Sequence, residues 1–303
     1  MAGAHQLAQV HLGFRSACSN GSMDTLTTGD GLKLHLQRWP ATGPVLGTLQ
    51  IVHGLGEHIG LYENLALALN ALGWHVNGHD QRGHGLSEGP RGGIASSQAL
   101  LTDLSAVIDH LRGSSLGPHI LLGHSLGGLV AARFAAESLM SRPRRWAREI
   151  DGLVLSSPAL EPRLNWPQRL LLRVLMPLAP NLGLGNGLKP RWISRDPEVV
   201  RRYVEDPLVH KRVTPRLVRF IVDEGRRVHA GASRWHTPTL LMWAGADRCV
   251  EPAGSVAFAA AVPSEVLIAQ EFPTLFHEIF NEPEREQVIA RLTTWLERFH
   301  AAS

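Results

Sequence analysis

The sequence has few of the features that mark secreted, membrane-spanning or nucleic-acid-binding proteins. Its 303 residues contain two cysteines, Cys18 and Cys249, which are too few for a disulfide framework and fit a reducing compartment. No apolar run approaches the ~20 residues that a membrane span needs. The formal net charge of +3 is too small to indicate a nucleic-acid partner. These absences predict a cytoplasmic protein without nucleic acid as a partner.

The first residues also lack the pattern of a secretory signal, because polar His5, Gln6 and Gln9 interrupt the apolar stretch and no charged segment opens it. The regular pattern of strands and helices begins only after Met23. We therefore expect residues 1–22 to be a disordered tail or a tag outside the fold.

From residue 32 onward, short apolar runs alternate with segments of helical periodicity. Strands are expected in the runs KLHLQRW (an edge strand, half-buried), GTLQIVHG, WHVNGHD, HILLGH, GLVLSSP, TLLMWAG and VLIAQEF. Helices are expected over residues 61–72, 98–112 and 126–139, from about Pro252, and from about Pro283 to His300. Repeated βα units predict a mostly parallel, doubly wound α/β sheet with helices on both faces.

One long segment interrupts this alternation. Residues 159–238 contain many prolines and helix-like apolar clusters but no clear strand, which predicts a helical cap, or lid, inserted into a core of residues 23–158 and 239–303. The segment is also basic: residues 161–235 hold 15 Lys/Arg and 7 Asp/Glu, an excess of 8 positive charges. Solvated arginine at helix ends accounts for this charge, and attraction to an anionic surface is the alternative.

The segment GHSLGG, residues 123–128, contains the pattern G-x-S-x-G centred on Ser125. In a glycine-rich chain this pattern alone is weak, but a strand precedes it and a helix rich in small residues follows. A sharp strand-to-helix turn needs glycine beside the serine and holds the hydroxyl at the edge of the sheet. The context therefore predicts a nucleophile; an ordinary serine N-cap is the alternative.

A serine nucleophile needs a base, and the base needs an acid to orient it. In this architecture the chain order is Ser, then Asp or Glu, then His. Asp247 follows the run TLLMWAG, and His277 follows the run VLIAQEF, so both have the correct order and lie after strands. Taken singly, Asp247 could be a turn residue and His277 a loop histidine. Asp151 precedes its strand and is a poor rival acid.

An acyl-transfer site also needs two N–H donors for the oxyanion. The backbone of Leu126, next to the serine, is one candidate. The second is Leu55 in the loop HGLGEH, where Gly54 and Gly56 allow close approach of the backbone. His53 and Glu57 of this loop are expected to be structural.

The combination of HGLGEH, GHDQRGHGLSEGPRG, GHSLGG, SRDPEVVRRYVEDPLVH, the GADR loop and FHEIFNEPER resembles the α/β-hydrolase family of monoacylglycerol lipases and lysophospholipases. The resemblance implies an α/β-hydrolase fold and a Ser-His-Asp esterase whose mobile cap covers an acyl pocket and docks on membranes. It places Ser125, Asp247 and His277 on the catalytic triad, and Leu55 and Leu126 on the oxyanion donors. Two further matches, Glu57 and Tyr203, fall on residues that hold the glycerol headgroup. An arginine of the family is replaced by Leu61, which weakens the case for monoglyceride.

The expected function is hydrolysis of lipid-like carboxylic esters, such as monoacylglycerol or lysophospholipid, through an acyl-enzyme intermediate. The expected partners are the small-molecule acyl ester and, through the cap, a peripheral membrane contact. Alternatives are a short-chain carboxylesterase without lipid preference, an aminopeptidase-type hydrolase, and a binding protein on the same fold. The apolar stretch RLLLRVLMPLAP either lines the acyl pocket or faces a membrane, or it forms ordinary cap core. The sequence does not indicate an oligomeric state.

Other polar residues are assigned smaller roles. Asp80 and Arg82 are expected to form a structural ion pair near the site. Cys249 is expected to be a buried cysteine, and a modification there would disturb the neighbouring acid loop. No cofactor is expected, because the chain has no dinucleotide fingerprint, and no metal site is expected from the spacing of its histidine pairs (His79/His84 and His53/His58).

Overall fold

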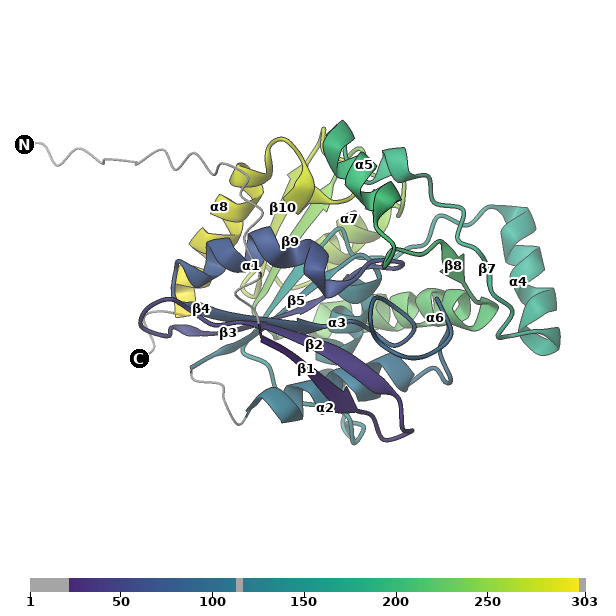
Figure 1. The fold of residues 1–303 in the computed structure, drawn as a ribbon, viewed down its shortest axis with the longest axis horizontal. Helices are drawn as coiled ribbons and strands as arrows, with labels where there is room; N and C mark the ends of the chain where they lie inside the picture. Colours follow the sequence, from purple (N-terminus) through teal and green to yellow (C-terminus); the bar gives the residue numbers. More distant parts are fainter. Residues whose placement is uncertain (1–21, 113–116, 300–303) are drawn as a thin grey trace, which may run out of the picture.

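The structure is a computed structural model that describes residues 22–112 and 117–299. The expected N-terminal tail lies, except for Ser22, outside the described residues. An eight-stranded sheet forms the centre of the molecule, in the order β1-β2-β4-β3-β5-β6-β9-β10 (Figure 1). Its strands are β1 (Ser22–Thr27), β2 (Lys33–Trp39), β3 (Gly47–Val52), β4 (Trp74–His79), β5 (His119–His124), β6 (Gly152–Ser156), β9 (Thr239–Ala244) and β10 (Leu267–Phe272).

All pairings from β4 to β10 are parallel, and β2 runs antiparallel to both of its neighbours. The central strands β3, β5, β6 and β9 are buried along their whole length, as expected for a parallel sheet covered on both faces. Consecutive side chains point to opposite faces, so Leu121 and Leu122 of β5 belong to two different apolar clusters. The predicted doubly wound α/β fold is confirmed.

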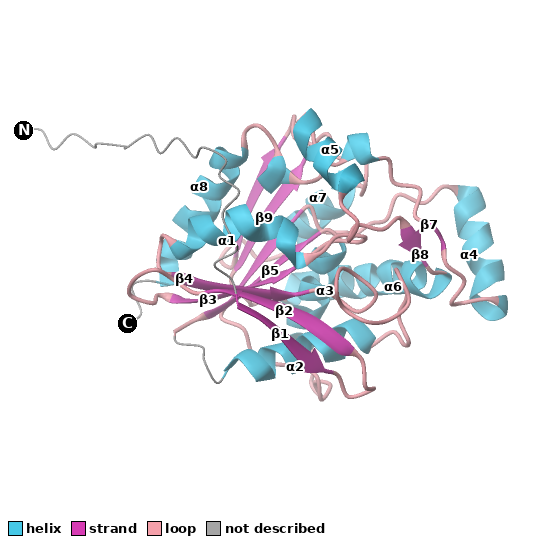
Figure 2. Ribbon diagram, in the orientation of Figure 1, coloured by secondary structure: helices cyan, strands magenta, loops and turns pink. Residues whose placement is uncertain are grey.

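Helices cover both faces of the sheet (Figure 2). On one face, α1 (Glu63–Asn70) and α8 (Arg285–Leu296) pack in one apolar cluster. On the other face, α2 (Ala99–Arg112), α3 (Leu126–Ala136) and α7 (Pro252–Ala261) pack in a second cluster. The helix expected over 126–139 becomes 3-10 after Ala136. The last helix is shorter than expected, because a 3-10 turn covers Glu297–Phe299, and His300 lies outside the described residues.

The expectation that KLHLQRW is an edge strand is wrong. The strand β1 pairs with β2 over its full length, from Ser22 opposite Arg38 to Thr27 opposite Lys33, and β1 is the edge strand. The alternation of apolar and polar residues in β2 suggested a solvated face, but the side chains of His35 and Gln37 are buried. The alternation of residues along a strand does not reveal whether a further strand pairs with its edge, or whether its polar face is covered.

The inserted segment contains α4 (Trp166–Leu178), β7 (Leu184–Gly185), a 3-10 turn at Pro190–Trp192, α5 (Pro197–Glu205), β8 (Arg212–Val213) and α6 (Pro215–Gly231). Against expectation it includes two short strands, β7 and β8, which form a ribbon of two residue pairs. Strands of two residues have no period that a sequence pattern could reveal. Helix α6 packs against α3, whereas α4 projects at one end of the molecule (Figure 1).

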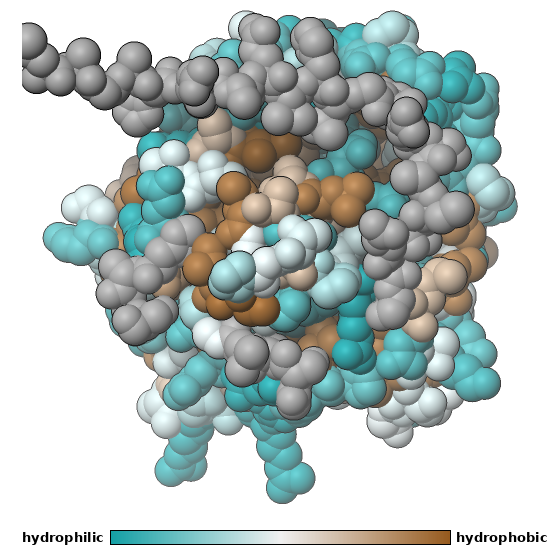
Figure 3. Space-filling view, turned by 60° about the vertical axis from the view of Figure 1, so that its left-hand side comes forward, coloured by the Kyte–Doolittle hydropathy of each residue, from teal (hydrophilic) through white to brown (hydrophobic). Residues whose placement is uncertain are grey.

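Apolar surface occurs on more than one side of the molecule. Figure 3 turns the left-hand side of Figure 1 forward, and on this face residues of high hydropathy gather near the centre with hydrophilic residues around them. Leu67 and Leu72 of the α1 region have exposed side chains. Within the described ranges, no helix is both long and apolar enough to cross a membrane.

Candidate active site

Ser125 occupies the sharp turn between β5 and α3. Its backbone has φ 53° and ψ −117°, a left-handed conformation that is strained for a residue with a side chain. A Cβ atom on Gly127 would collide with the carbonyl of Val52, and one on Gly128 would lie 2.8 Å from Pro158. Only glycine therefore fits at positions 127 and 128, in the first turn of α3. The side chain of Ser125 forms no helix-capping hydrogen bond, which excludes the role of an ordinary N-cap.

Asp247 and His277 lie at the carboxyl ends of two adjacent parallel strands, β9 and β10. Their side chains meet with His277 Nδ1 2.6 Å from Asp247 Oδ2. The other carboxylate oxygen of Asp247 accepts hydrogen bonds from the backbone N–H groups of Cys249, at 2.7 Å, and Val250, at 3.1 Å. Because both oxygens have donors, the carboxylate is held in one orientation, and its contact fixes the orientation of the His277 ring.

The electrostatic surroundings of His277 favour its protonated form. Burial alone would lower the pKa of this histidine, but the charge and hydrogen bond of Asp247 raise it above the usual value of 6.5, with smaller contributions from Glu57 and Glu278. A histidine with this environment is a stronger base than one in water. It can accept a proton from a hydroxyl and stabilise the resulting imidazolium.

The structure brings Ser125 and His277 into one region, where His277 contacts His124, the residue before the serine. The ring of His124, which precedes Ser125, lies 4.7 Å from the ring of His277 between centroids. Within residues 22–112 and 117–299, the hydroxyl of Ser125 has no hydrogen bond to His277. Bonds between a nucleophile and its base are often long in a free enzyme and tighten when substrate binds.

The two expected oxyanion donors lie in the same pocket as the serine. Leu55, Ser125 and Leu126 together line a cavity of about 120 Å³. Neither the Leu55 nor the Leu126 backbone N–H donates a hydrogen bond to another described residue. Both residues border the pocket on which Ser125 lies, which is the position that two oxyanion donors require. The remainder of the lining is largely apolar, with residues from the cap and the core: Ala159, Pro162, Leu164, Leu188, Val213, Val218, Ile221 and Val250.

Glu57 and Tyr203, the residues matched to headgroup binding, do not line this cavity. Glu57 is buried and accepts hydrogen bonds from the backbone of Gly54, at 2.9 Å, and from the hydroxyl of Tyr62, at 2.8 Å. These contacts support the structural role expected for the glutamate, because they hold the loop that carries Leu55. His53 also holds the loop, since its Nε2 accepts the backbone N–H of Gln81 at 2.9 Å.

Sequence reasoning missed an acidic residue beside the base. Glu278 is buried, and burial followed by the charge of Glu57 raises its pKa to about 8. Its backbone N–H donates to the carbonyl of Ile193 in the cap, at 2.8 Å. The sequence pointed to Glu278 only through its position directly after His277. Sequence adjacency does not reveal that its carboxyl group is buried near a second acid, Glu57.

Asp247, Cys249 and His277 place one possible ligand atom each within 4.8 Å of one another. Burial raises the pKa of the Cys249 thiol well above its usual value, so this sulfur is protonated at neutral pH. The Nδ1 atom of His277 and both carboxylate oxygens of Asp247 are engaged in hydrogen bonds. The arrangement suits an oriented base better than a metal site, which needs free lone pairs and a thiolate.

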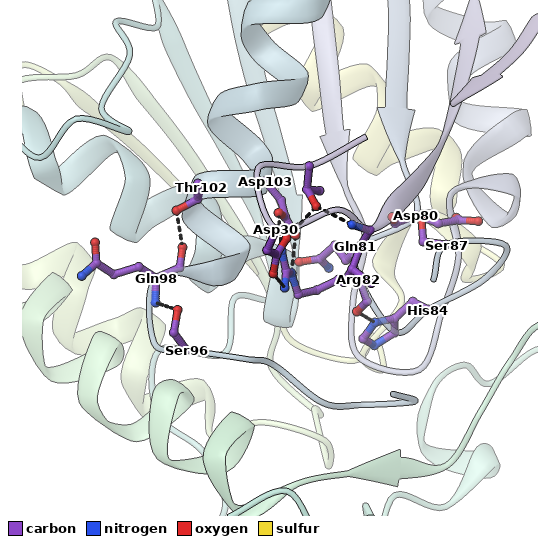
Figure 4. Close-up of polar contacts among 12 residues, drawn as sticks. Asp30, Asp80, Gln81, Arg82, His84, Ser87, Ser96, Gln98, Thr102 and Asp103 are labelled. Atoms are coloured by element: carbon purple, nitrogen blue, oxygen red, sulfur yellow. Dashed lines mark hydrogen bonds and ion pairs between the residues drawn. The ribbon is translucent and has the colours of Figure 1, made fainter. Parts of the chain in front are cut away.

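The expected ion pair between Asp80 and Arg82 is wrong. Arg82 pairs instead with the buried Asp103, at 2.5 and 2.7 Å, and with Asp30, at 2.9 Å (Figure 4). Asp80 accepts the backbone N–H groups of Ile59, at 2.7 Å, and Leu86, at 2.8 Å. The two side chains are close in sequence but diverge from the turn. This network fixes the loops near the site, as expected, through different partners.

Comparison with known proteins gives matches over most of the chain. Residues 43–284 match the family model described as "Serine aminopeptidase, S33". The chain is 33% identical over 278 residues to a monoacylglycerol lipase of Mycolicibacterium smegmatis, covering 88% of this chain and 93% of the relative. It is 33% identical over 265 residues to the phospholipase YtpA of Bacillus subtilis, covering 86% and 98%. It also matches, at 29% identity, an uncharacterised abhydrolase domain-containing protein of Dictyostelium discoideum, of whose length it spans 29%.

Solved structures agree with these relatives. The monoacylglycerol lipase of Paleococcus ferrophilus superimposes with a TM-score of 0.77 at 36% identity, covering 88% of this chain and 99% of that chain. A monoglyceride lipase of Saccharomyces cerevisiae has a TM-score of 0.83 at 21% identity, covering 96% of this chain and 99% of that one, which shows the shared fold. The α/β-hydrolase fold and the carboxylic ester hydrolase class predicted from the motifs are thereby confirmed. The chain belongs to the serine aminopeptidase S33 family of α/β hydrolases, and the relatives that it matches include monoacylglycerol lipases.

Proposed function

We propose that the chain hydrolyses carboxylic esters of lipid-like substrates through an acyl-enzyme intermediate. The observation that carries the proposal is the 2.6 Å contact between Asp247 and His277, together with a pocket that Ser125 lines with Leu55 and Leu126, the two residues expected to supply oxyanion donors. In the first half-reaction His277 takes the hydroxyl proton while the oxygen of Ser125 attacks the ester carbonyl. The N–H groups of Leu55 and Leu126 stabilise the oxyanion.

Later in the same half-reaction, collapse of the tetrahedral intermediate breaks the ester bond, and His277 gives its proton to the departing alcohol. In the second half-reaction His277 takes a proton from the water that attacks the acyl carbon. The bond between that carbon and the Ser125 oxygen then breaks, His277 returns the proton to Ser125, and the fatty acid leaves. Asp247 holds the ring of His277 in place and stabilises the imidazolium. Each role follows from a group within or beside the pocket.

The lining of the pocket supports an acyl chain as the bound group. Apolar residues of the cap and the core surround the serine, and such surfaces bind hydrocarbon by excluding water. Monoacylglycerols and lysophospholipids are the substrate classes we propose, in keeping with the names of the relatives. Aminopeptidase action is less well supported, because the described lining contains Arg163 and no acidic residue that could hold a cationic N-terminus.

The substrate proposal is tested by product analysis on matched panels. Monoacylglycerols, lysophospholipids, p-nitrophenyl esters of graded chain length and amino-acid anilides are each incubated with the wild-type chain and with Ser125→Ala. We expect fatty-acid release from the lipid esters by the wild type alone. Preferential cleavage of the anilides, or equal release by the variant, would contradict the proposal.

We also propose a peripheral membrane contact through α4. This helix carries a stripe of exposed apolar residues on one side, and Trp166 and Leu178 are each 76% exposed; the other members are Leu170, Leu171 and Val174. An exposed amphipathic helix with tryptophan at one end is typical of segments that lie in the membrane interface. We expect vesicles to shift the tryptophan fluorescence to shorter wavelength. Trp166→Phe, in which the other seven tryptophans remain, should remove most of that shift. Leu170→Asn should weaken binding to vesicles. Leu67→Asn, at an exposed leucine of α1 outside the inserted segment, is the matched control and should not weaken it.

A further inference from the structure

A second cavity lies between the cap helices α4 and α6, next to the pocket of Ser125. Its volume is about 340 Å³, and it shares Pro162 and Leu164 with the catalytic pocket. Four arginines line it, two from each helix. These are Arg169 and Arg173 of α4 and Arg219 and Arg226 of α6.

The spacing of these residues places them on single helix faces. Arg169 and Arg173 are four residues apart, so they are neighbours on α4. On α6, the cavity is lined by residues 219, 222, 226 and 229, which recur at intervals of three and four and share one face. Two helices therefore direct their cationic faces at the same space.

The positive charge in this cavity is poorly compensated by the protein. Arg219 forms an ion pair with Asp223 at 2.6 Å, and Arg169 donates to the carbonyl of Leu164 at 3.0 Å. Among the residues that the structure describes, Arg173 and Arg226 form no ion pair. The acidic residue in the described lining is Glu161. All four arginines are exposed, so water screens much of their mutual repulsion, and a bound anion would neutralise the positive potential that remains.

A histidine in the lining adds no positive charge at neutral pH. Burial lowers the pKa of His229, although the charge of Glu161 opposes this effect. An anion placed in the cavity would raise the pKa of His229. This histidine therefore reports the occupation of the cavity independently of any enzymatic activity.

Phosphate matches the donors that the cavity offers. Guanidinium groups bind phosphate oxygens through paired N–H donors, and they do so more effectively than lysine. The position of the cavity identifies the source of the phosphate. The exposed apolar stripe of α4 and the cationic face at Arg169 and Arg173 are adjacent sides of one helix. When the stripe enters a bilayer, the arginines lie at the level of the lipid headgroups.

We propose that the cavity between α4 and α6 binds the phosphate of an anionic phospholipid headgroup in the bilayer on which α4 docks. The inference rests on the membrane contact proposed above and adds a specific site to it. Because the cavity shares a wall with the pocket of Ser125, the bound headgroup fixes the entrance of the acyl pocket against the membrane surface.

The first test compares two charge-matched double variants, both made in the Ser125→Ala background so that no lipid is hydrolysed. Arg173→Gln with Arg226→Gln removes one free guanidinium from each helix. Arg145→Gln with Arg298→Gln removes two exposed arginines that do not line the cavity. Binding is measured by co-sedimentation with vesicles of phosphatidylglycerol and phosphatidylcholine, and with vesicles of phosphatidylcholine alone. Thermal unfolding of each variant verifies that it is folded.

We expect the cavity variant to lose about thirtyfold in affinity for the anionic vesicles, because each basic residue near a charged surface contributes about fivefold and two are removed. The control variant should lose less than threefold. An equal loss in both variants would mean that only overall charge matters and would overturn the site. Failure of the Ser125→Ala chain to bind either kind of vesicle would overturn it as well.

The second test separates a lipid headgroup from free phosphate. The pKa of His229 is followed by NMR with inorganic phosphate and with soluble dihexanoyl-phosphatidylglycerol. We expect the short-chain lipid to raise it in the Ser125→Ala chain and not in the cavity variant. A response to inorganic phosphate alone would identify a free-phosphate site and overturn the lipid assignment. Turnover of p-nitrophenyl butyrate by the wild type tests the proposed hydrolase separately, because neither binding measurement depends on catalysis.

Discussion

The backbone N–H of His210 in the cap donates a 3.0 Å hydrogen bond to the carbonyl oxygen of Gly56 in the core. Gly56 follows Leu55 directly and has φ +81°, which favours glycine. A Cβ atom at this position would collide with the carbonyl oxygen of His210. The cap therefore rests on the loop that carries one of the proposed oxyanion donors, so the position of the cap and the geometry of the pocket are coupled.

Replacement of Gly56 by alanine should break the hydrogen bond between His210 and Gly56 and displace Leu55. We expect kcat for a soluble ester to fall by about tenfold or more, approaching the 10²–10³ range for loss of an oxyanion donor. Gly183→Ala is the matched control in the cap, because nothing lies within 4 Å of its added Cβ and its backbone is unrestricted. Wild-type kcat in Gly56→Ala would show that the loop does not need this contact.

The charge of Asp247 should set the acid limb of the pH profile. Asp247 raises the pKa of His277 against the effect of burial, and the base works only when neutral, so kcat/KM falls as the pH drops below that raised pKa. In Asp247→Asn burial remains while the charge is gone, and the acid limb should move to lower pH. We also expect kcat to fall by about 10⁴. An acid limb that stays in place would contradict the role of Asp247.

Two substitutions at Ser125 should separate catalysis from backbone strain. Ser125→Ala should abolish turnover and leave the fold intact, because the hydroxyl makes no hydrogen bond within the described ranges on which the turn depends. Ser125→Gly should also be inactive but more stable than Ser125→Ala by about 1 kcal/mol, since φ 53° is unfavourable for any residue with a Cβ. Denaturant unfolding of both variants measures the difference. Equal stabilities would mean that the turn is not strained.

Arg82 should contribute more to stability than an arginine in an exposed pair. Asp103 is buried, and burial raises its pKa even beside Arg82, so removal of the arginine leaves an uncompensated acid in the core. We expect Arg82→Gln to lower the free energy of unfolding by about 3–5 kcal/mol. Arg148→Gln, which breaks the exposed pair with Asp109, should cost about 1 kcal/mol or less. Urea denaturation compares the two.

Glu278 should make the folded state less stable as the pH rises. Its pKa is raised to about 8 by burial and by Glu57, so between its usual pKa of 4.5 and about 8 the folded chain holds a proton that the unfolded chain has lost. Stability from this proton is full below pH 4.5 and is lost as the pH rises toward and through 8. Glu278→Gln should flatten this decline in thermal unfolding profiles. An unchanged slope would mean that the carboxyl group is already ionised at neutral pH.

Much of the site could be predicted from local patterns. The elbow at Ser125, and the positions of Asp247 and His277 after successive strands, follow from rules of chain order and strand ends that hold throughout this architecture. Apolar periodicity likewise located the seven predicted strands of the core. The strand β1 was missed because its pairing with β2 adds a neighbour without changing the pattern of either strand.

The sequence by itself determined the fold class, the order of the catalytic candidates and the basic character of the cap, because these depend on residue type and local periodicity. Only the tertiary structure decided which groups meet across long separations. It paired Arg82 with Asp103 rather than with Asp80, buried Glu278 near Glu57, and directed arginines from α4 and α6 at one cavity. Such contacts depend on how distant segments pack, and packing leaves no periodic trace in the sequence.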